Sequence, residues 1–435
     1  MDALKIRHAA AMPAPTWSWL RMNDTTIAVP ADLARGGMMG IDAGEQLTST
    51  SESFEGAIAG LQERIDAERT DADDTRACVR SARGENARPA EANDAADLGD
   101  LDLPALSAYQ RRATLDEVAG DVAASFETGV GIDARSYLNF LAGETVTFAA
   151  KPDATEQAAV HLRGVQGEAG AASIDVVAAA GSTLDVVISL DGTSETQGSA
   201  AEGTTGFIGS ELRVFAGAHA HVNVTVYVTA DAGFTVVDDS GYVLDEGARV
   251  NVRHVVLGGG FVATGLAADL RGDTARIDID TRYLAAGSDV RDFNYVVRHR
   301  GRKTVSQIMA NGVLAGTSKK VLRGTIDLIH GCKGSEGTER ETVLLANQGV
   351  DNKTVPTILC DEDDVAGNHG ATIGHVRPDQ LFYLASRGIS PEAAEGLFMR
   401  AKLEDAYLGA PDDTIRDNVR RLGAALFPDF EEDLA

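Results

Sequence analysis

A two-residue alternation of apolar with polar or small side chains begins at Glu144 and continues for most of the following two hundred residues. Segments such as SIDVVAAAGSTLDVVISLDG, HAHVNVTVYV and ARVNVRHVVL have this period, which is that of a β-strand. Because no helical stretch separates the strands, the pattern excludes a doubly wound α/β sheet. A sandwich or barrel and a parallel β-helix remain. The length of the run and the small inward residues favour the β-helix, in which each coil covers its neighbour's core.

Helical periodicity flanks this strand-rich body on both sides. On the N-terminal side it predicts a helix over Glu52–Arg69 and helical structure within Leu103–Gly143, separated by a mobile acidic linker at about residues 69–102. On the C-terminal side, helices are expected over Asp379–Arg387 and after the start signal Ser390-Pro391, followed by a last helix. The expected fold is therefore mainly β, with an N-terminal helical region at 1–142, a parallel β-helix at 143–375 and a C-terminal helical subdomain at 376–435.

The same periodicities predict which faces of the C-terminal helices are buried and where the strand pattern breaks. The helix after Ser390 is expected to bury Ala394, Leu397, Phe398 and Ala401. The last helix is expected to bury Ile415, Val419, Leu422 and Leu426. The segment Asp191–Gly206, DGTSETQGSAAEGTTG, interrupts the strands and is expected to be a flexible excursion.

The formal net charge of −27 argues against partners that are themselves strongly negative. Such a field repels phosphate backbones and anionic lipid surfaces, so neither nucleic acid nor membrane binding is expected as the main function. No apolar run of membrane-spanning or signal-peptide length occurs in the sequence. The three cysteines form no CxxC pair, which argues against a disulfide framework or a zinc site. These features predict a cytoplasmic location.

Common catalytic signatures are absent from the sequence. There is no GxxxxGK[ST] loop, so the chain is not expected to have a nucleotide site of its own, and there is no HExxH, GxSxG or dinucleotide-binding fingerprint. The basic stretch RHRGRKT, Arg298–Thr304, could hold an anionic ligand, although a solvated loop face is the favoured interpretation. A chain that is not catalytic alone is therefore expected.

The segment from Cys360 to His369 is dense in side chains that bind metals. The acids of CDEDD suit a hard cation such as Ca²⁺, whereas a thiolate or an imidazole suits iron or zinc. The alternative, favoured for the acids, is that Asp363 and Asp364 cap a turn and that Cys360 is a small buried side chain. His369 stands among small residues in DDVAGNHGATIG, which leaves its imidazole sterically open as a candidate ligand.

Three segments of the C-terminal part occur together and in order: NGVLAGTSKKVLRGTIDLIHG, LLANQGVDNKTVPTILCDEDDVAGNHGATIG and DQLFYLASRGIS. In this combination the chain resembles the SufD members of the SufB/SufD family of iron–sulfur cluster assembly proteins. A looser likeness extends back to GETVTFAAKPDATEQAAVHLRG, at about Gly143. Within the family the tetrapeptide HGAT favours the SufD members, because the matching segment of SufB reads more like HEAT.

The resemblance implies a scaffold subunit with a β-helix between two helical regions. It implies pairing with a SufB-like protein through the β-helix, docking of a SufC-like ABC ATPase on the C-terminal helices, and sulfur supplied indirectly by a cysteine desulfurase system. A homodimer of the isolated chain and reduced flavin on the assembled complex also follow from the resemblance. The residues that match the family segment at the ATPase-docking helices are Leu381, Phe382, Tyr383, Arg387 and Ile389.

In this family the histidine of HGAT is implicated in forming a transient cluster at the interface with SufB, and that residue is His369 here. The resemblance thus makes His369 the candidate iron ligand, with Cys360 and Cys332 as secondary candidates. Many SufD sequences have a cysteine two residues before this histidine, where this chain has Gly367, so His369 would act with ligands from the partner chain. Two rival functions are a stand-alone β-helix enzyme acting on polysaccharides and a purely structural partner that donates no cluster ligand.

Overall fold

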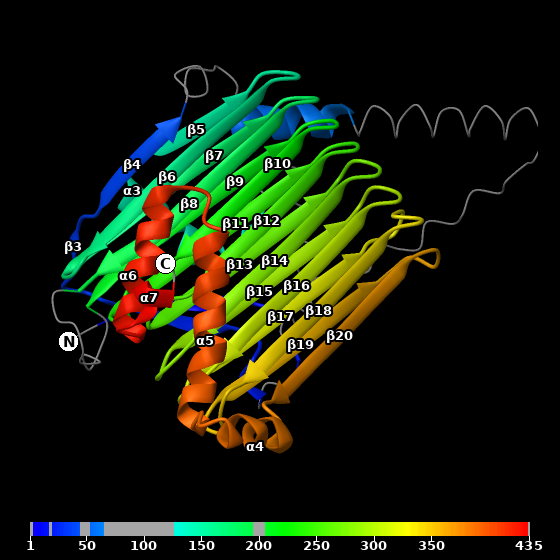
Figure 1. Cartoon of the computed structure of the whole chain (residues 1–435). Helices are drawn as coiled ribbons and strands as arrows, with labels where there is room; N and C mark the ends of the chain where they lie inside the picture. The colour runs from blue at the N-terminus through cyan, green and yellow to red at the C-terminus, as the bar shows by residue number, and fades with distance from the viewer. Residues whose placement is uncertain (1–2, 17–19, 44–52, 65–125, 195–204, 434–435) are drawn as a thin grey trace, which may run out of the picture.

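The structure, a computed structural model, describes residues 3–16, 20–43, 53–64, 126–194 and 205–433. Its body is a solenoid in which successive strands alternate between two facing sheets (Figure 1). Each strand of the body pairs in parallel with the strand two positions further along the chain. This arrangement confirms the mainly β class and the parallel β-helix predicted from the two-residue period.

From β3 onward, the even-numbered strands form the first sheet and the odd-numbered strands form the second. In order across the first sheet these are β20 (Ala366–His375), β18 (Glu336–Leu345), β16 (Val305–Leu314), β14 (Arg276–Ala285), β12 (Arg249–Val256), β10 (His221–Val228), β8 (Thr183–Thr193), β6 (Thr155–Val165) and β4 (Met38–Ala43). Across the second they are β19 (Asp351–Cys360), β17 (Lys319–Leu328), β15 (Val290–His299), β13 (Phe261–Leu270), β11 (Phe234–Leu244), β9 (Gly206–Ala216), β7 (Glu168–Ala178) and β3 (Ala34–Arg35), and β5 (Thr145–Ala150) also pairs with β7. Strand β4 runs antiparallel to β6.

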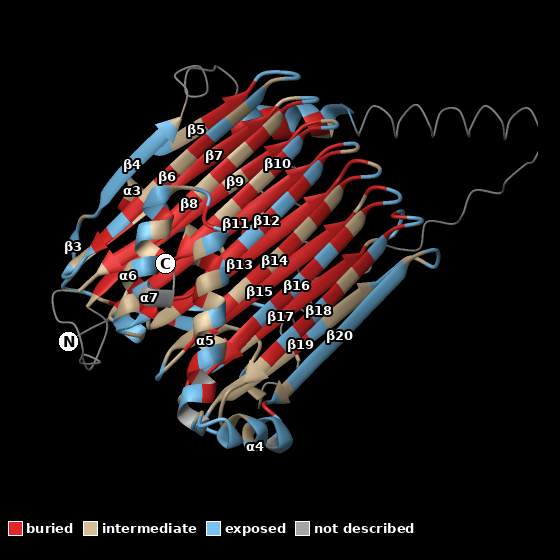
Figure 2. Cartoon of the chain, viewed as in Figure 1, coloured by how far each residue is buried: buried red, intermediate tan, exposed pale blue. Residues whose placement is uncertain are grey.

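The main core is the solenoid interior between the two sheets, where at least every second side chain of the central strands is buried (Figure 2). Val222, Val224 and Val226 of β10 illustrate the pattern, and they stack on equivalent residues of the neighbouring strands. Tight corners between the coils require glycine. Gly287 has a φ of +54°, and a Cβ on Gly272 would lie 2.0 Å from the backbone nitrogen of Glu246. The alternation in the sequence is thus the alternation between interior and outer face.

N-terminal elements pack on the outer face of the second sheet. They are the antiparallel pair β1 (Ala3–Ala9) and β2 (Thr25–Pro30), a helical stretch at residues 54–64, and α3 (Ile132–Ala142). The helix predicted within Glu52–Arg69 is confirmed over the described residues 54–64, where Ile58 and Leu61 are buried. The sequence pattern predicts helical structure in this N-terminal region and does not predict the strands β1 to β4. The predicted linker at about residues 69–102 lies outside the described residues.

The C-terminal helices α5 to α7 pack on the outer face of the first sheet, and α4 packs against α5. They are α4 (Pro378–Ser386), α5 (Pro391–Leu408), α6 (Asp413–Leu426) and the short α7 (Phe430–Asp433) (Figure 1). Ser390 caps α5 as predicted, because its Oγ accepts a hydrogen bond from the backbone nitrogen of Ala393 at 3.2 Å. Arg421 of α6 donates to Asp191 and Asp231 at 2.6 and 2.5 Å and so fixes the helix to the solenoid. None of the helices in the described part of the chain is long and apolar enough to cross a membrane.

The predicted apolar face of α5 is partly wrong. Leu397 is 46% exposed and Ala401 is also exposed, whereas Leu403 and Ala406 are buried. The reason is that the sheet, rather than the helical neighbours, sets the buried face: the hydroxyl of Tyr227 on β10 donates to the carbonyl of Ala406 at 3.1 Å. For α6, the predicted Ile415, Val419 and Leu422 are buried, but Leu426 is 40% exposed.

The predicted excursion at Asp191–Gly206 is shorter than expected at both ends. Strand β8 continues to Thr193 and β9 begins at Gly206. Asp191 is 4% exposed and binds both Thr229 and Arg421, so these first residues belong to the packed body. Residues 195–204 of the predicted excursion lie outside the described residues.

Candidate functional site

The last coil, made of β19, the turn at residues 361–365 and β20, forms the C-terminal end of the solenoid and is called the open end below. Strand β20 is the edge of the first sheet, and among the described residues no strand pairs with its second edge. All its residues except Gly374 are exposed (Figure 2). An edge strand of this length presents a row of unpaired backbone groups to a partner.

The register between β18 and β20 determines where His369 points. His369 pairs with Glu339, and Gly367 pairs with Gly337, in parallel strands whose matched side chains leave the same face. Glu339 is buried in the solenoid interior, and a Cβ on Gly367 would meet Ile358 and Leu328, which are interior side chains of the second sheet. His369 therefore extends the stack of interior side chains, and its imidazole is exposed because the solenoid ends there.

Position 367, where the resemblance leads us to expect a cysteine and this chain has glycine, is crowded by Ile358. A Cβ on Gly367 would lie 2.9 Å from Cγ2 of Ile358, and Ile358 packs on the interior core. Side-chain atoms of Ile358 thus approach the place that a thiol at residue 367 would take. This packing gives a physical reason why glycine fits there in this chain.

Of the two cysteines named as secondary ligands, Cys360 reaches the open end and Cys332 does not. Cys360 is the last residue of β19, is exposed, and directs its Sγ to the carbonyl of Glu362 at 3.3 Å, so the prediction that it is buried is wrong. His369 lies three residues into β20, about 10 Å along the strand from its start. Cys332 is buried in the turn one coil below, where burial raises the pKa of its thiol. Neither is placed as an evident ligand beside His369.

The acidic turn is capped by Glu362 rather than by Asp363 and Asp364. The Glu362 carboxylate accepts hydrogen bonds from the backbone nitrogens of Gly331 at 2.9 Å and Asp363 at 3.1 Å. It thereby joins the last turn to the one below, which is why the glutamate, with its longer side chain, takes this role. Within the described residues, no group of three or more His, Cys, Asp or Glu side chains is placed to hold a metal ion.

Charged side chains occupy the solenoid interior just below the open end. Lys320 of β17 and Glu341 of β18 are 0% and 2% exposed and form an ion pair. Glu341 also accepts hydrogen bonds from the hydroxyls of Thr354 at 2.5 Å and Tyr283 at 3.1 Å. Glu341 is therefore held by three donors, which offset the cost of burying its charge.

Glu339 lies in the same interior with fewer partners. It is 3% exposed, and its Oε1 has no hydrogen-bond partner among the described residues. Its carboxyl group takes the space left by Gly324, since a Cβ there would lie 2.6 Å from the carboxyl carbon. Burial, together with the charge of Glu341, raises the pKa of Glu339 to about 7, and Lys320 opposes this shift.

The residues predicted to dock an ATPase lie on and after α4, beside the open end. Phe382 is 77% exposed and Tyr383 56% exposed, and the Arg387 guanidinium lies 5.0 Å from the Tyr383 ring centre. Leu381 and Ile389 are half-buried. A surface pocket between α4 and α5 is lined by Val376, Asp379, Gln380, Tyr383, Leu384 and Phe398. The structure thus brings the aromatic candidates to the surface and turns the aliphatic ones partly inward.

The basic stretch Arg298–Thr304 does not form an anion site, because its arginines are paired with acids. Arg300 binds Asp269 at 2.9 Å and Arg302 binds Asp273 at 2.6 Å. Arg298 in turn binds Glu127 at 2.6 Å, which ties the segment before α3 to the second sheet. The favoured interpretation as a solvated loop face is wrong for part of the stretch, because Arg298, His299 and Thr304 are buried and the first two belong to β15.

A groove on the outer face of the first sheet can be compared with a polysaccharide site. Its lining includes the carboxylates of Asp278 and Asp280. Asp278 accepts two hydrogen bonds from Arg276, at 2.6 and 2.8 Å, and Asp280 accepts one from Arg282 at 3.1 Å. Glycoside cleavage by an acid–base pair needs one carboxyl group that can be protonated. The arginine contacts occupy oxygens of both carboxylates and so disfavour that chemistry.

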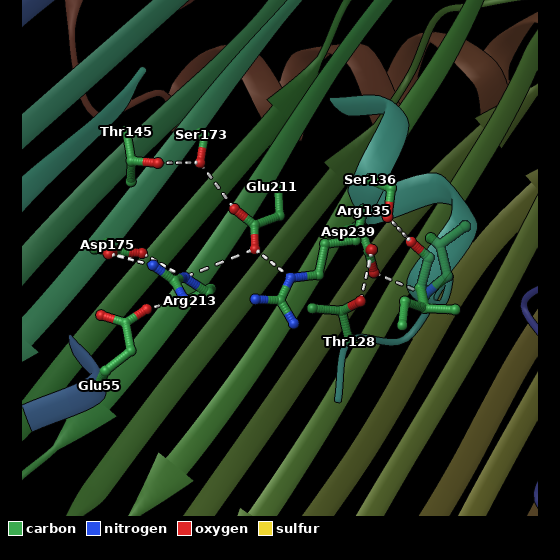
Figure 3. A network of polar contacts seen from close by, with 12 residues as sticks. Glu55, Thr128, Arg135, Ser136, Thr145, Ser173, Asp175, Glu211, Arg213 and Asp239 are labelled. Atoms are coloured by element: carbon green, nitrogen blue, oxygen red, sulfur yellow. Dashed lines mark hydrogen bonds and ion pairs between the residues drawn. The ribbon is translucent and has the colours of Figure 1, made fainter. Parts of the chain in front are cut away.

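A dense charged network on the outer face of the second sheet is structural (Figure 3). Arg213 binds Asp175 through two hydrogen bonds of 2.6 Å and Glu55 through a third, also of 2.6 Å. Arg135 of α3 lies 3.1 Å from Glu211. Asp239 accepts hydrogen bonds from Thr128 and from the backbone of Val130, both at 2.7 Å. The network fastens the N-terminal elements to the solenoid.

Sequence reasoning missed Lys320, Glu339 and Glu341. Their strand segments, KKVLRGTIDL and EGTERETVLL, place charges at the positions that are apolar in the other strands. The available signal was the spacing of Glu339 and Glu341 from Val343, which assigns all three to one face. Charged residues at interior spacing would have identified a polar interior near His369.

Residues 161–402 match the SufBD core domain of the SUF system for FeS cluster assembly. The chain is 32% identical over 129 residues to the iron–sulfur cluster assembly protein SufD of Bacillus subtilis, an alignment covering 30% of each chain. It is 24% identical over 185 residues to SufD of Escherichia coli, covering 42% of this chain and 44% of that protein. A chloroplastic SufBD family protein of Arabidopsis thaliana is 28% identical over 116 residues, covering 26% of this chain and 21% of that one. Each alignment spans less than half the length of the relative.

Proposed function

This chain belongs to the SufBD family of the SUF system for iron–sulfur cluster assembly, whose core domain matches more than half of it, and from this premise we propose that it acts as a SufD-like scaffold subunit rather than as an enzyme. The observation that carries the proposal is His369, held on an unpaired edge strand and in line with the interior of the solenoid. The same strand offers a docking edge and a metal-binding side chain.

The open end is the proposed surface for a SufB-like partner. The free edge of β20 supplies backbone hydrogen-bond donors and acceptors in regular order, which suits the addition of a strand from another chain. Ile373, 46% exposed and on the same face as His369, offers apolar area that a partner would cover. Pairing at this end would place His369 inside the interface.

His369 is the proposed contact of this chain with the nascent cluster. Iron and sulfide are substrates of the assembly, and the cluster would be held only transiently. The imidazole supplies one nitrogen ligand, and thiolate ligands would come from the partner, in keeping with the position of Cys332 and Cys360 away from the centre of β20.

The α4 helix is the proposed docking element for a SufC-like ATPase. Phe382 and Tyr383 present aromatic area to solvent, as a partner-binding helix does. Only Val376 and Arg377 separate β20 from α4. Because Val376 is buried and this connection is short, a displacement of α4 by an ATP-driven partner would be transmitted to the strand that carries His369.

The test is a pull-down of the tagged full chain, followed by cluster reconstitution with whatever SufB-like and ATPase partners are recovered. His369→Ala should leave partner recovery unchanged and reduce cluster formation at least tenfold. His375→Ala, which removes an exposed histidine from the same strand, is the matched control and should retain activity. Failure to recover either partner, with or without nucleotide, would refute the proposed function.

A purely structural role is the second candidate, and Gly367 favours it. A subunit without a thiol beside the HGAT histidine has one donor fewer at the interface. In that case His369→Ala would support cluster formation at the wild-type rate while the complex still assembled. The reconstitution experiment therefore separates the two roles.

A further inference from the structure

A carboxylate with an unsatisfied oxygen lies one coil below His369. Glu339 is only 3% exposed, and its Oε1 has no hydrogen-bond partner among the described residues. Buried carboxylate oxygens without a partner are uncommon because the lost hydration is not replaced. The side chain thus requires an explanation beyond packing.

The neighbouring charges do not supply the missing partner. The Lys320 ammonium donates to Glu341 and, at 3.2 Å, to Thr354. Glu341 receives further hydrogen bonds from Thr354 and Tyr283. With one ammonium for two carboxylates, the cluster has an excess negative charge whenever both glutamates are ionised, and this charge resides on Glu339. A proton or a bound cation can neutralise it.

The strand register places an imidazole where it can share such a cation. Glu339 and His369 are matched residues of β18 and β20, and their side chains leave the same face of the sheet. Neighbouring strands lie about 4.8 Å apart. Bonds from a first-row metal to imidazole nitrogen and carboxylate oxygen are about 2.1 Å each. The Glu339 carboxyl group itself lies against Gly324 of β17, so sharing one ion with His369 requires the Glu339 side chain to turn toward the open end.

We propose that Glu339 and His369 together bind ferrous iron, as the two ligands that this chain contributes at the open end. The inference rests on the proposed function and deepens it by naming a second residue of the same site. Carboxylate oxygen and imidazole nitrogen are donors that suit a divalent first-row metal. The remaining positions are filled by water or by the partner, because two ligands do not complete the coordination of the ion.

Glu341 is excluded as the ligand by its own contacts, although it is on the same strand and the same face. Its two oxygens are occupied by Lys320, Tyr283 and Thr354, and its register partner on β20 is Ala371, which has no donor atom. Glu339 differs on both counts. Glu339 has an oxygen without a hydrogen-bond partner among the described residues, and its register partner on β20 is His369.

The test is an anaerobic titration of the full-length chain with Fe²⁺ in competition with a chromophoric chelator, repeated with Co²⁺ to record its ligand-field absorption. Glu339→Gln and His369→Ala should each weaken Fe²⁺ binding at least tenfold, and the double variant should be little weaker than either one. Glu339→Gln keeps the shape of the side chain and removes the buried charge, so its thermal midpoint should equal or exceed that of the wild type. Asp361→Asn is the control, since it removes an exposed acid from the last turn of the same end.

Fe²⁺ affinity of Glu339→Gln within twofold of the wild type would overturn the inference. If His369→Ala alone lost iron, the proposed role of His369 would stand and Glu339 would be refuted as a ligand. If both variants lost iron but no SufB-like or ATPase partner were recovered in the pull-down, the metal site would be supported and the proposed function refuted. The two failures are therefore distinguishable.

Discussion

The interior of the solenoid contains a neutral histidine–carboxyl pair whose effect on stability can be predicted with its sign. Asp238 of β11 and His254 of β12 are 1% and 0% exposed, and Oδ2 of Asp238 lies 3.4 Å from Nε2 of His254. Neither atom has another hydrogen-bond partner among the described residues. A protonated Asp238 satisfies both atoms by donating to the imidazole, whose Nδ1–H then faces the Tyr295 hydroxyl at 3.3 Å.

Burial raises the pKa of Asp238 to about 7 and lowers the pKa of His254 to about 3, so both groups are neutral together over a wide range of pH. Unfolded Asp238 ionises near pH 4, so between about pH 4 and pH 7 the folded state holds one more proton at Asp238. Asp238 therefore contributes a fall in the free energy of unfolding of about 1.4 kcal/mol per pH unit through this window. His254, whose pKa is lowered in the folded state, contributes a rise of similar slope up to its unfolded pKa of about 6.5, so the Asp238 contribution is isolated by comparing variants at each pH. From pH 5 to pH 8 this contribution amounts to about 3 kcal/mol, because it ends near pH 7.

Asp238→Asn should remove this contribution. The amide nitrogen can donate to His254 as the protonated acid does, and the amide oxygen can accept the hydrogen bond that Ser210 gives to Asp238 at 3.1 Å. Relative to the wild type, the variant should gain about 3 kcal/mol of stability between pH 5 and pH 8. Urea unfolding followed by far-ultraviolet circular dichroism at the two pH values measures the change. Asp278→Asn, on the outer face of β14, controls for the lost charge, and parallel pH profiles of wild type and Asp238→Asn would refute the reasoning.

Three further predictions concern packing and anchoring. Gly129→Ala should cost about 3 kcal/mol in urea unfolding, because the new Cβ would lie 1.9 Å from the backbone nitrogen of Leu266, which cannot move without displacing a strand. Arg421→Ala should cost about 2 kcal/mol, less than for a fully buried ion pair, and should accelerate limited proteolysis of the C-terminal helices. Gly367→Cys should lower the thermal midpoint, because the contact at 2.9 Å is with Cγ2 of Ile358, a methyl group on the branched Cβ that can move only with the whole side chain, and thiol titration should detect the new group.

The sequence allowed the solenoid to be predicted because its core follows one local rule. Interior residues alternate with outward ones, so strands such as β10 and β12 could be recognised without knowledge of their neighbours. The face of α5 could not be predicted in this way. Its burial depends on contact with the sheet through Tyr227, a residue 179 positions from Ala406. Strands β3 and β4 likewise form because the body offers them β7 and β6 as partners.

For the site, the sequence pointed to His369 but not to its surroundings. The likeness of HGAT to a family motif singled out the residue, and the strand register then fixed the direction of its side chain. The contact of Glu362 with Gly331 depends on the stacking of two turns thirty-one residues apart, so a local argument assigned the cap to Asp363 and Asp364 instead. Charged interior residues were missed because a period based on hydrophobicity gives no weight to a buried glutamate.

The change in the solenoid interior along its length bears on what can dock at the open end. The central coils are filled mainly by apolar side chains and contain the neutral Asp238–His254 pair, whereas the last coils contain the charged Lys320, Glu339 and Glu341 together with Thr354. A partner that sealed this end with apolar side chains alone would bury the free oxygen of Glu339 still more deeply, at a cost of several kcal/mol if it stayed ionised. A partner that brings metal, water or hydrogen-bond donors to the interface avoids that cost. Pairing through the edge of β20 is therefore physically compatible with a polar centre around His369, and a dry apolar interface at the same place is not.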